Sequence, residues 1–314
     1  MTSYRSIVVG YDGSDGAVDA LALGSLLADT VGAQLTIVGI CAADPWLGMD
    51  DPRFQWVDPE MSRDMAEAAQ SVTCESACVP STSAPRGLHD FAQKNGADLI
   101  VVGSSPRAGI GRVLAGSVSQ RLLQGGPGAV AVAPSGFRDR ELALRVIGVG
   151  FNGTPESQDA LDAAVTIGKA AEATMRLFVV AETSHATPSV GAAPDTNAGR
   201  GRYQELLHET LGAVPDKLRA AGTLLEGAPA AALLDEAEKG VDLLCLGSCG
   251  YGPLRRVLLG SVSSEVVQSA LCPVLVVPRR AEEASSTVDE LLGGEKSAVC
   301  AMLAPTQPNP AATA

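Results

Sequence analysis

The sequence predicts an α/β protein made of two tandem Rossmann-like domains, each an open five-stranded parallel sheet with helices on both faces. Short apolar runs alternate with longer helical segments, which is typical of βαβ units. The chain also repeats itself. "IVVGYDGSDGAVDAL" (Ile7–Leu21) and "IGVGFNGTPESQDAL" (Ile147–Leu161) match at 7 of 15 positions, and Asp98–Pro134 resembles Asp242–Pro278 in the same way. The repeating unit is therefore a whole domain.

Each predicted strand is a short run rich in Val, Ile, Leu or Ala. In the first repeat the predicted strands are Ser6–Gly10, Gln34–Ile40, Ser71–Cys74, Leu99–Gly103 and Ala129–Ala133. In the second repeat they are Arg145–Gly150, Met175–Ala181, Gly222–Leu225, Leu243–Gly247 and Val274–Val277. Helices are predicted between them, among them Gly16–Val31 and Ser157–Ala171. Right-handed crossovers then give a doubly wound sheet.

The predicted domains cover residues 1–138 and 142–280. Two segments rich in Pro, Gly and polar residues, Ala42–Glu60 and Thr183–Arg202, are expected to be long surface loops. The acidic, Pro- and Ala-containing tail, residues 281–314, is expected to be disordered. The fifth strands of the two repeats are expected to pair, because each is a short apolar edge that would otherwise invite aggregation.

Composition narrows the function classes. The 314 residues suffice for two domains, and the net charge of -13 argues against a nucleic-acid binder. No apolar run is long enough to span a bilayer, so the protein is expected in the cytoplasm without a membrane contact. Seven cysteines, without any C-x-x-C pair, are expected to be free thiols. The three histidines lack ligand spacing, and no metal ligand is assigned.

A glycine-rich loop follows the fourth strand of the second repeat. Its spacing is Gly247, two residues, Gly250, nine residues, Gly260 and Ser261. Glycines permit close approach of a ligand, and Ser261 is expected to cap the helix that follows, so the loop predicts an anion site at the carboxyl ends of the strands. Neither G-x4-G-K-[ST] nor a G-x-G-x-x-G after the first strand is present, which disfavours P-loop enzymes and dinucleotide dehydrogenases.

These features resemble the universal stress protein family in its tandem two-domain form, over about residues 4–280. The resemblance rests on the glycine spacing, on "VGYDGS" after the first strand, and on "EGAPAAALLDEA" (Glu226–Ala237). It implies a stress-response regulatory protein that binds ATP, with or without Mg²⁺. It also implies sheet edges that pair through the fifth strand, a homodimer and an unidentified protein partner.

Twenty positions are candidates for contact with the nucleotide, most of them implied by the resemblance, and no catalytic residue is assigned. In the first repeat they are Gly10, Asp12, Ile40, Gly103, Ser104, Pro106, Arg112, Gly116, Ser117 and Val118. In the second repeat they are Gly150, Asn152, Val180, Gly247, Ser248, Gly250, Arg256, Gly260, Ser261 and Val262.

Each repeat departs from the family pattern once. Asn152 stands where the family usually has Asp, and its amide carries no charge to hold a metal ion. Pro106 replaces the second glycine of the first loop and excludes a positive φ there. Arg112 and Arg256 either touch phosphate or are solvated, and Asp12 either shapes a turn or faces the ligand.

The loops offer backbone amides but no P-loop lysine, so ATP binding with little or no turnover is the favoured interpretation. Two alternatives stay open. One is a nucleotide-independent scaffold that binds a protein partner, and the other is a slow ATPase that uses Asp12. Nucleotide extracted from the purified protein, or steady phosphate release, separates them.

Overall fold

The computed structural model describes residues 4–42, 59–181, 196–248 and 259–278. The first repeat contains β1 (Ser6–Gly10), α1 (Asp15–Val31), β2 (Gln34–Ala42), α2 (Pro59–Val72), β3 (Glu75–Ser81), α3 (Ala84–Asn95), β4 (Leu99–Gly103), α4 (Ser117–Leu123) and β5 (Ala129–Ala133). A 3-10 helix, η1 (Phe137–Asp139), leads into the second repeat. That repeat contains β6 (Val146–Gly150), α5 (Pro155–Ala171), β7 (Thr174–Ala181), α6 (Thr196–Ala213), β8 (Ala220–Glu226), α7 (Pro229–Ala237), β9 (Leu243–Gly247), α8 (Ser261–Val266) and β10 (Val274–Val277).

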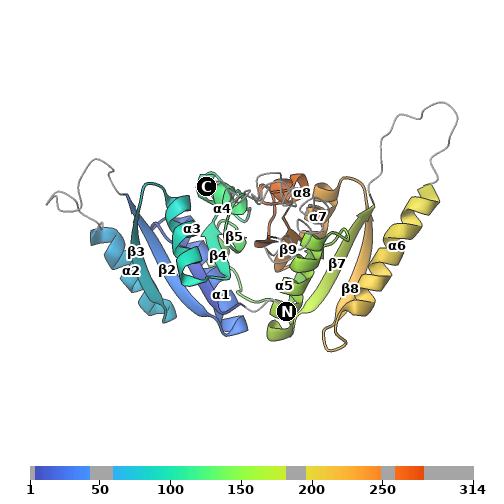
Figure 1. Ribbon diagram of the computed structural model, residues 1–314, viewed down its shortest axis with the longest axis horizontal. Coiled ribbons are helices and arrows are strands. Elements are labelled where there is room, and N and C mark those ends of the chain that lie inside the picture. The colour runs from blue at the N-terminus through green and yellow to red at the C-terminus, as the bar shows by residue number, and fades with distance from the viewer. Residues whose placement is uncertain (1–3, 43–58, 182–195, 249–258, 279–314) are drawn as a thin grey trace, which may run out of the picture. The chain divides into compact units, whose positions relative to one another are not determined.

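The strands of both repeats join in one sheet of ten strands, in the order β3-β2-β1-β4-β5-β10-β9-β6-β7-β8 (Figure 1). Strands within a repeat pair in parallel, whereas β5 and β10 pair antiparallel, with Leu275 opposite Ala131. This confirms the expected pairing of the two fifth strands. Every residue of β5 and β10 is buried, so pairing removes two apolar edges from solvent.

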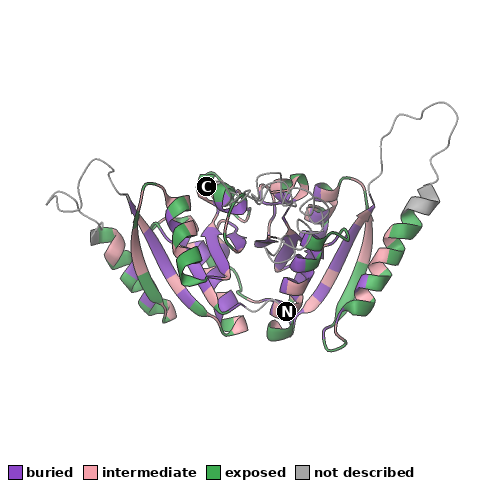
Figure 2. Ribbon diagram, viewed as in Figure 1, coloured by how far each residue is buried: buried purple, intermediate pink, exposed green. Residues whose placement is uncertain are grey.

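Helices cover both faces of the sheet, as the sequence predicts. On one face α1, α2, α5 and α6 contribute to a single core, in which α1 and α5 meet across the boundary between the repeats. On the other face α3, α4, α7 and α8 pack over the second core. Figure 2 shows buried residues concentrated along the central strands. Parallel strands buried on both faces explain why these strands read as apolar runs without polar alternation.

The helix–strand boundary near residue 72 differs from the prediction. Ser71 and Val72 end helix α2, Thr73 has a positive φ of 54°, and the third strand begins only at Glu75. Every residue of β3 is exposed or half-buried, because it is the outermost strand of the first repeat. An edge strand of this kind lacks the apolar run that marks the central strands, which is why its position was predicted wrongly.

Both expected loops are wrong at their ends. In Ala42–Glu60, β2 still includes Ala42 and α2 already begins at Pro59, and in Thr183–Arg202, α6 already begins at Thr196. The remainder of that segment, residues 43–58 of the other expected loop, and the tail at 281–314 lie outside the described residues. None of the described helices combines the length and the apolar character that crossing a bilayer requires.

The cysteines also differ from the prediction. Cys41 on β2 and Cys78 on β3 form a disulfide, although the sequence predicts free thiols throughout. The two residues are 37 positions apart, so no local spacing motif could indicate their pairing. Cys74, Cys245 and Cys272 are free, and Cys249 lies outside the described residues.

Candidate functional site

A pocket of about 310 Å³ opens at the carboxyl ends of β1 and β4. In the sheet, the chain goes from β1 to β2 and β3 on one side of β1, and then crosses to β4 and β5 on its other side. The pocket therefore lies at the point where the strand order reverses. Open α/β sheets usually bind their ligands at this point. The pocket is lined by residues that follow β1, by the ends of β2 and β4, by α3, and by the loop and first turn of α4.

Asp12 forms a corner of this pocket and shapes a turn at the same time. Its Oδ1 accepts hydrogen bonds from the main-chain N of Ser14 at 3.1 Å and from Ser14 Oγ at 2.6 Å. Ser14 Oγ in turn accepts from the N–H of Ala17 at 3.2 Å and caps α1. The second carboxylate oxygen of Asp12 has no hydrogen-bond partner among the described residues, so both interpretations of Asp12 fit the geometry.

Tyr11 lies beside Asp12 in the pocket wall. The pKa of Tyr11 is raised above its ordinary value, mainly by partial burial and to a lesser extent by the nearby carboxylates of Asp64 and Asp12. The phenol therefore stays protonated at neutral pH and keeps a hydroxyl that can donate a hydrogen bond.

Gly103, the first glycine of its loop, is required by packing inside the protein. A Cβ at this position would lie 1.9 Å from the carbonyl oxygen of Gly16, at the start of α1. The corresponding Cβ at Gly247 would lie 2.5 Å from the carbonyl oxygen of Glu156 on α5. In both repeats this glycine brings the strand end against a helix start, so packing within the protein requires it in addition to any approach of a ligand.

Hydrogen bonds within the protein fix the loop between β4 and α4. Ser104 is buried, donates its hydroxyl to the carbonyl of Ala133 at 2.7 Å, and accepts from the N–H of Leu114 at 3.2 Å. The N–H of Ala108 bonds the carbonyl of Ser105, so Pro106 occupies the second position of a turn, where its fixed φ is favourable. The positive φ of the loop, 82°, falls at Gly111 instead. Pro106 is thus accommodated in a turn, and the residue with the positive φ is Gly111.

A second pocket, of about 360 Å³, lies at the equivalent carboxyl ends of β6 and β9. Asn152 takes the place of Asp12 and makes the same turn. Its Oδ1 accepts from the N–H of Thr154 at 3.2 Å and from Thr154 Oγ1 at 2.8 Å, and Thr154 caps α5. The fold is therefore preserved by the amide, while the second pocket loses the negative charge at this corner.

The helices that follow the two loops are short. Helix α4 has seven residues and α8 has six, and their N-caps are Gly116 and Gly260. Ser261 is the first helical residue, so the expectation that it caps the helix is wrong. Glycine also serves as an N-cap, and neither helix has a side-chain cap hydrogen bond. Short helices carry small dipoles, so for an anion in either pocket the loop amides would be more important hydrogen-bond donors than the helix dipole.

Most of the twenty predicted positions gather at the two pockets. The first pocket is lined by Gly10, Asp12, Ile40, Gly103, Ser104, Pro106, Gly116, Ser117 and Val118. The second is lined by Gly150, Asn152, Val180, Gly247, Ser248 and Val262. Arg112 does not line the first pocket, nor do Gly260 and Ser261 line the second. Gly250 and Arg256 lie outside the described residues.

Several lining residues were not predicted. In the first pocket they include Tyr11, Ala84 and Leu88, and in the second Tyr203 and Leu233. Tyr11 directly precedes Asp12 and could have been included for that reason. Leu88 and Tyr203 sit on helices whose ordinary apolar pattern carries no sign of a site.

Comparisons with known proteins agree with this architecture. The model of the universal stress protein family matches residues 3–134 and 143–278. Universal stress protein Rv2319c of Mycobacterium tuberculosis is 28% identical over 300 residues, covering 87% of this chain and 99% of that protein. A universal stress protein of Mycolicibacterium smegmatis is 32% identical over 206 residues, covering 63% of this chain and 67% of that protein. The crystal structure of a universal stress protein from Archaeoglobus fulgidus shares the fold, with a TM-score of 0.63 at 18% identity over 88% of this chain and 98% of that one.

Proposed function

Because this chain belongs to the universal stress protein family, we propose that it is a regulatory protein of the stress response that binds ATP in both repeats and hydrolyses it at a negligible rate. Nucleotide occupancy would then bias which conformation or partner the protein prefers, an effect that requires different affinities for the nucleotide in two states.

The observation that carries the proposal is the arrangement of polarity across the first pocket. On one side of β1, the apolar side chains of Ile40 and Leu88 form a wall. On the other side, the loop after β4 and the start of α4 supply backbone amides and hydroxyls. Asp12 follows β1, between the two walls. A nucleotide has the matching order: an apolar base, a sugar with hydroxyl donors, and a phosphate chain that accepts hydrogen bonds.

Gly116 adds support. A Cβ at this position would meet Ser105 at an ordinary contact distance of 3.6 Å, so the protein alone does not require glycine here. Its φ of -75° suits any residue. This contrasts with Gly103, where a Cβ would collide with backbone. A glycine that packing does not require, at the rim of a pocket, is expected where a ligand approaches the main chain.

The charges around the pockets favour binding over turnover. Among the described residues, no Lys or Arg lines either pocket, and Asp12 is the only carboxylate that does. Phosphoryl transfer needs positively charged groups beside the transferred phosphate and an oriented nucleophile. Backbone amides and hydroxyls suffice to hold phosphates without supplying either.

The proposal is tested by blocking each pocket separately. Gly116 lines the first pocket, and Gly260 is the N-cap of α8, two residues before Val262, which lines the second. Aspartate is a favoured N-cap residue, so in Gly116→Asp and Gly260→Asp the fold should persist while a carboxylate opposes the phosphates. Calorimetric titration with ATP should show two sites in the parent and one in each variant. Gly116→Ser and Gly260→Ser add a side chain without charge, so they should weaken each site less than aspartate does, through the steric part of the effect alone.

Nucleotide extracted from the purified protein identifies the physiological ligand, and ADP, AMP and cyclic AMP are titrated alongside ATP. A parent protein that neither carries nor binds any of them would overturn the proposal and favour the nucleotide-independent scaffold.

Three further expectations stay predictions. The domain limits at 1–138 and 142–280 are tested by expressing each repeat alone. A cytoplasmic location is tested by fractionation. Since β5 and β10 already pair with each other, a homodimer needs a different surface, and light scattering would detect it.

A further inference from the structure

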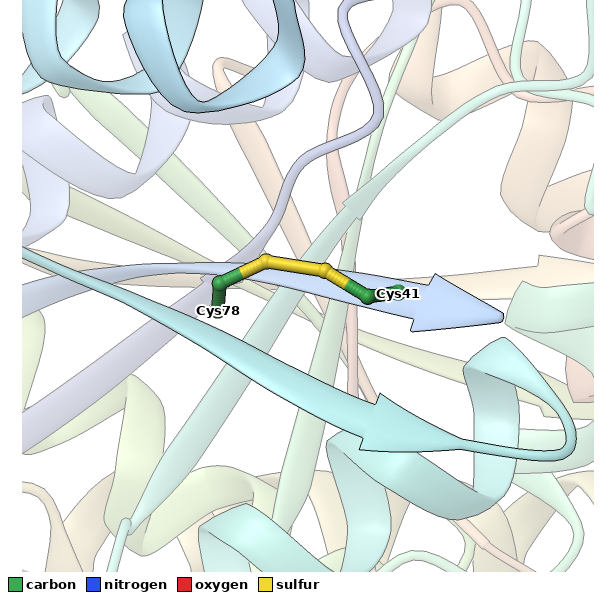
Figure 3. The surroundings of a disulfide bond; sticks show 2 residues. All are labelled: Cys41 and Cys78. Atoms are coloured by element: carbon green, nitrogen blue, oxygen red, sulfur yellow. A yellow bond between two sulfur atoms is a disulfide. The ribbon is translucent and has the colours of Figure 1, made fainter. Parts of the chain in front are cut away.

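Cys41, near the carboxyl end of β2, and Cys78, in the middle of β3, join these two neighbouring strands (Figure 3). In the register of β2 and β3, Cys41 lies opposite Pro80 and Cys78 lies opposite Gly39, so the pair spans the strands diagonally. Their Cα atoms are 6.5 Å apart, within the range that a disulfide bridges without backbone movement. Cys41 is buried, while Cys78 is half-buried and reachable from solvent.

This bond lies next to the apolar wall of the first pocket. Cys41 directly follows Ile40, whose side chain lines the pocket on the opposite face of β2. Helix α3 packs on the ends of both bridged strands, because a Cβ at Gly87 would meet Ile40 at 2.7 Å and Ser81 at 2.9 Å. The next residue, Leu88, lines the pocket as well. The spacing of β2 and β3 therefore determines the position of α3, and with it the position of Leu88 relative to Ile40 in the pocket wall.

We propose that Cys41 and Cys78 form a reversible redox site, oxidised by a low-molecular-weight disulfide, whose bond holds the apolar wall of the first pocket in place. The consequence for ligand affinity rests on the proposed nucleotide binding. The bond itself does not.

The chemistry is thiol–disulfide exchange. The more accessible Cys78 thiolate attacks the small disulfide, forms a mixed disulfide and expels one small thiolate. The Cys41 thiolate then attacks the Cys78 sulfur of that mixed disulfide, and the second small thiolate leaves. The two protein thiols lose two electrons and two protons, and the small disulfide becomes two thiols. A dithiol reductant reverses both steps.

The other described cysteines differ from this pair. Cys245 and Cys272 are buried and free, and burial raises the pKa of Cys272 to about 12, which leaves its thiol unreactive. The second repeat has no counterpart, because the positions equivalent to Cys41 and Cys78 in the strand register are Ala181 and Leu224. The second pocket thus serves as an internal control.

The first experiment follows the thiols in the full chain. The protein is equilibrated in buffers of graded reduced and oxidised glutathione, alkylated and analysed by peptide mass spectrometry. A Cys41–Cys78 peptide that appears and disappears reversibly supports the proposal. Two results overturn it: a bond that folded protein retains in excess dithiothreitol, which marks a structural disulfide, or a bond that never forms.

The second experiment measures the pocket wall. On reduction, amide hydrogen exchange in α3 should accelerate several-fold, while exchange in α7 stays unchanged. The variant Cys41→Ala, which copies Ala181, should exchange at the reduced rate in either buffer, and Cys74→Ala should keep the full redox response. Equal exchange in the oxidised and reduced parent overturns the proposal.

The third measurement is ATP titration of Gly260→Asp, in which only the first pocket is open. Reduction should weaken ATP binding several-fold, and the same treatment of Gly116→Asp should leave the second pocket unaffected. If exchange responds to redox state but no ATP binds, the redox site stands and the nucleotide proposal fails. If ATP binds equally in both states and exchange does not change, the redox proposal fails alone.

Discussion

The main-chain N–H of Val113, in the glycine loop of the first repeat, donates a 2.7 Å hydrogen bond to the carbonyl of Ala270 in the second repeat. Two residues on, Ala115 donates to Val267 at 3.0 Å. Val267 immediately follows α8, the helix that starts beside the second pocket. The loop of one pocket is thus attached to the helix of the other.

Arg140 strengthens this contact between the repeats. Its guanidinium donates to the carbonyl of Leu271 at 2.8 Å and to the carbonyl of Gly111 at 2.9 Å. Arg140→Ala should lower the free energy of unfolding by about 1 kcal/mol, because two charge-assisted but exposed hydrogen bonds are lost. Urea denaturation measures the change. The control Arg86→Ala removes only an exposed ion pair with Asp90 and should cost less than about 0.5 kcal/mol.

Asp19 lies on α1 and holds the segment between the two repeats against this helix. It is 1% exposed and accepts hydrogen bonds from the N–H groups of Gly136 at 2.8 Å and Arg138 at 3.0 Å. Asp19→Ala should destabilise the protein by about 2–4 kcal/mol, because two N–H groups lose a charged acceptor. Asp15→Ala, which removes an exposed ion pair with Arg138, should cost at most about 1 kcal/mol. Equal losses in the two variants would contradict this assignment.

The sequence and the structure agree where local pattern decides. The central strand Leu99–Gly103 begins and ends where its apolar run does, because both faces are buried. The edge strand β3 was misplaced because partial exposure leaves it without such a run. The pairing of Cys41 with Cys78 depends on strand register, which emerges only after folding. Local motifs likewise indicated the pocket corner at Asp12, whereas Leu88 reaches the pocket through helix packing.

Replacing glycine by alanine should lower stability where a Cβ would meet close neighbours and raise it in a helix where a Cβ would meet none. At Gly103 a Cβ would lie 1.9 Å from the backbone of Gly16, so Gly103→Ala must displace β4 or α1 and should cost more than about 3 kcal/mol. At Gly212, within α6, a Cβ would meet nothing within 4 Å. Gly212→Ala should therefore stabilise the protein by about 0.5–1 kcal/mol through helix propensity. Thermal unfolding of both variants checks the contrast, and a neutral Gly103→Ala would refute the close packing.

Glu236 should make stability depend on pH. A hydrogen bond from Lys239 at 2.6 Å, with a further contribution from Arg176, lowers its pKa below the ordinary 4.5. The folded state then binds this proton less readily than the unfolded state, so the stabilisation is complete above pH 4.5 and is lost as the pH falls through the lowered pKa. Glu236→Gln should be less stable than the parent by about 2 kcal/mol at pH 7, with a difference that shrinks below the ordinary pKa.

The matched control for Glu236 is Glu226→Gln. Glu226 pairs with Arg200 at 2.8 Å, but both side chains are more than half exposed. Its loss should change stability little at any pH. Urea midpoints at several pH values between 3 and 7 provide the measurement, and a Glu236→Gln deficit that does not narrow in acid would rule out the linkage.

The last prediction concerns turnover. In the presence of magnesium and ATP, the parent should release phosphate far more slowly than about 1 per second, the lower end of ordinary enzyme rates. The reason is the composition of the pockets: the described walls contain no Lys or Arg, and their only carboxylate is Asp12. The variant for comparison is Asp12→Asn, because Asn152 holds the equivalent turn in the second repeat with the same two hydrogen bonds, so the fold should be unaffected. A phosphate-release assay on both proteins decides the matter. Turnover near 1 per second in the parent that disappears in Asp12→Asn would make Asp12 a catalytic residue and the protein a slow ATPase.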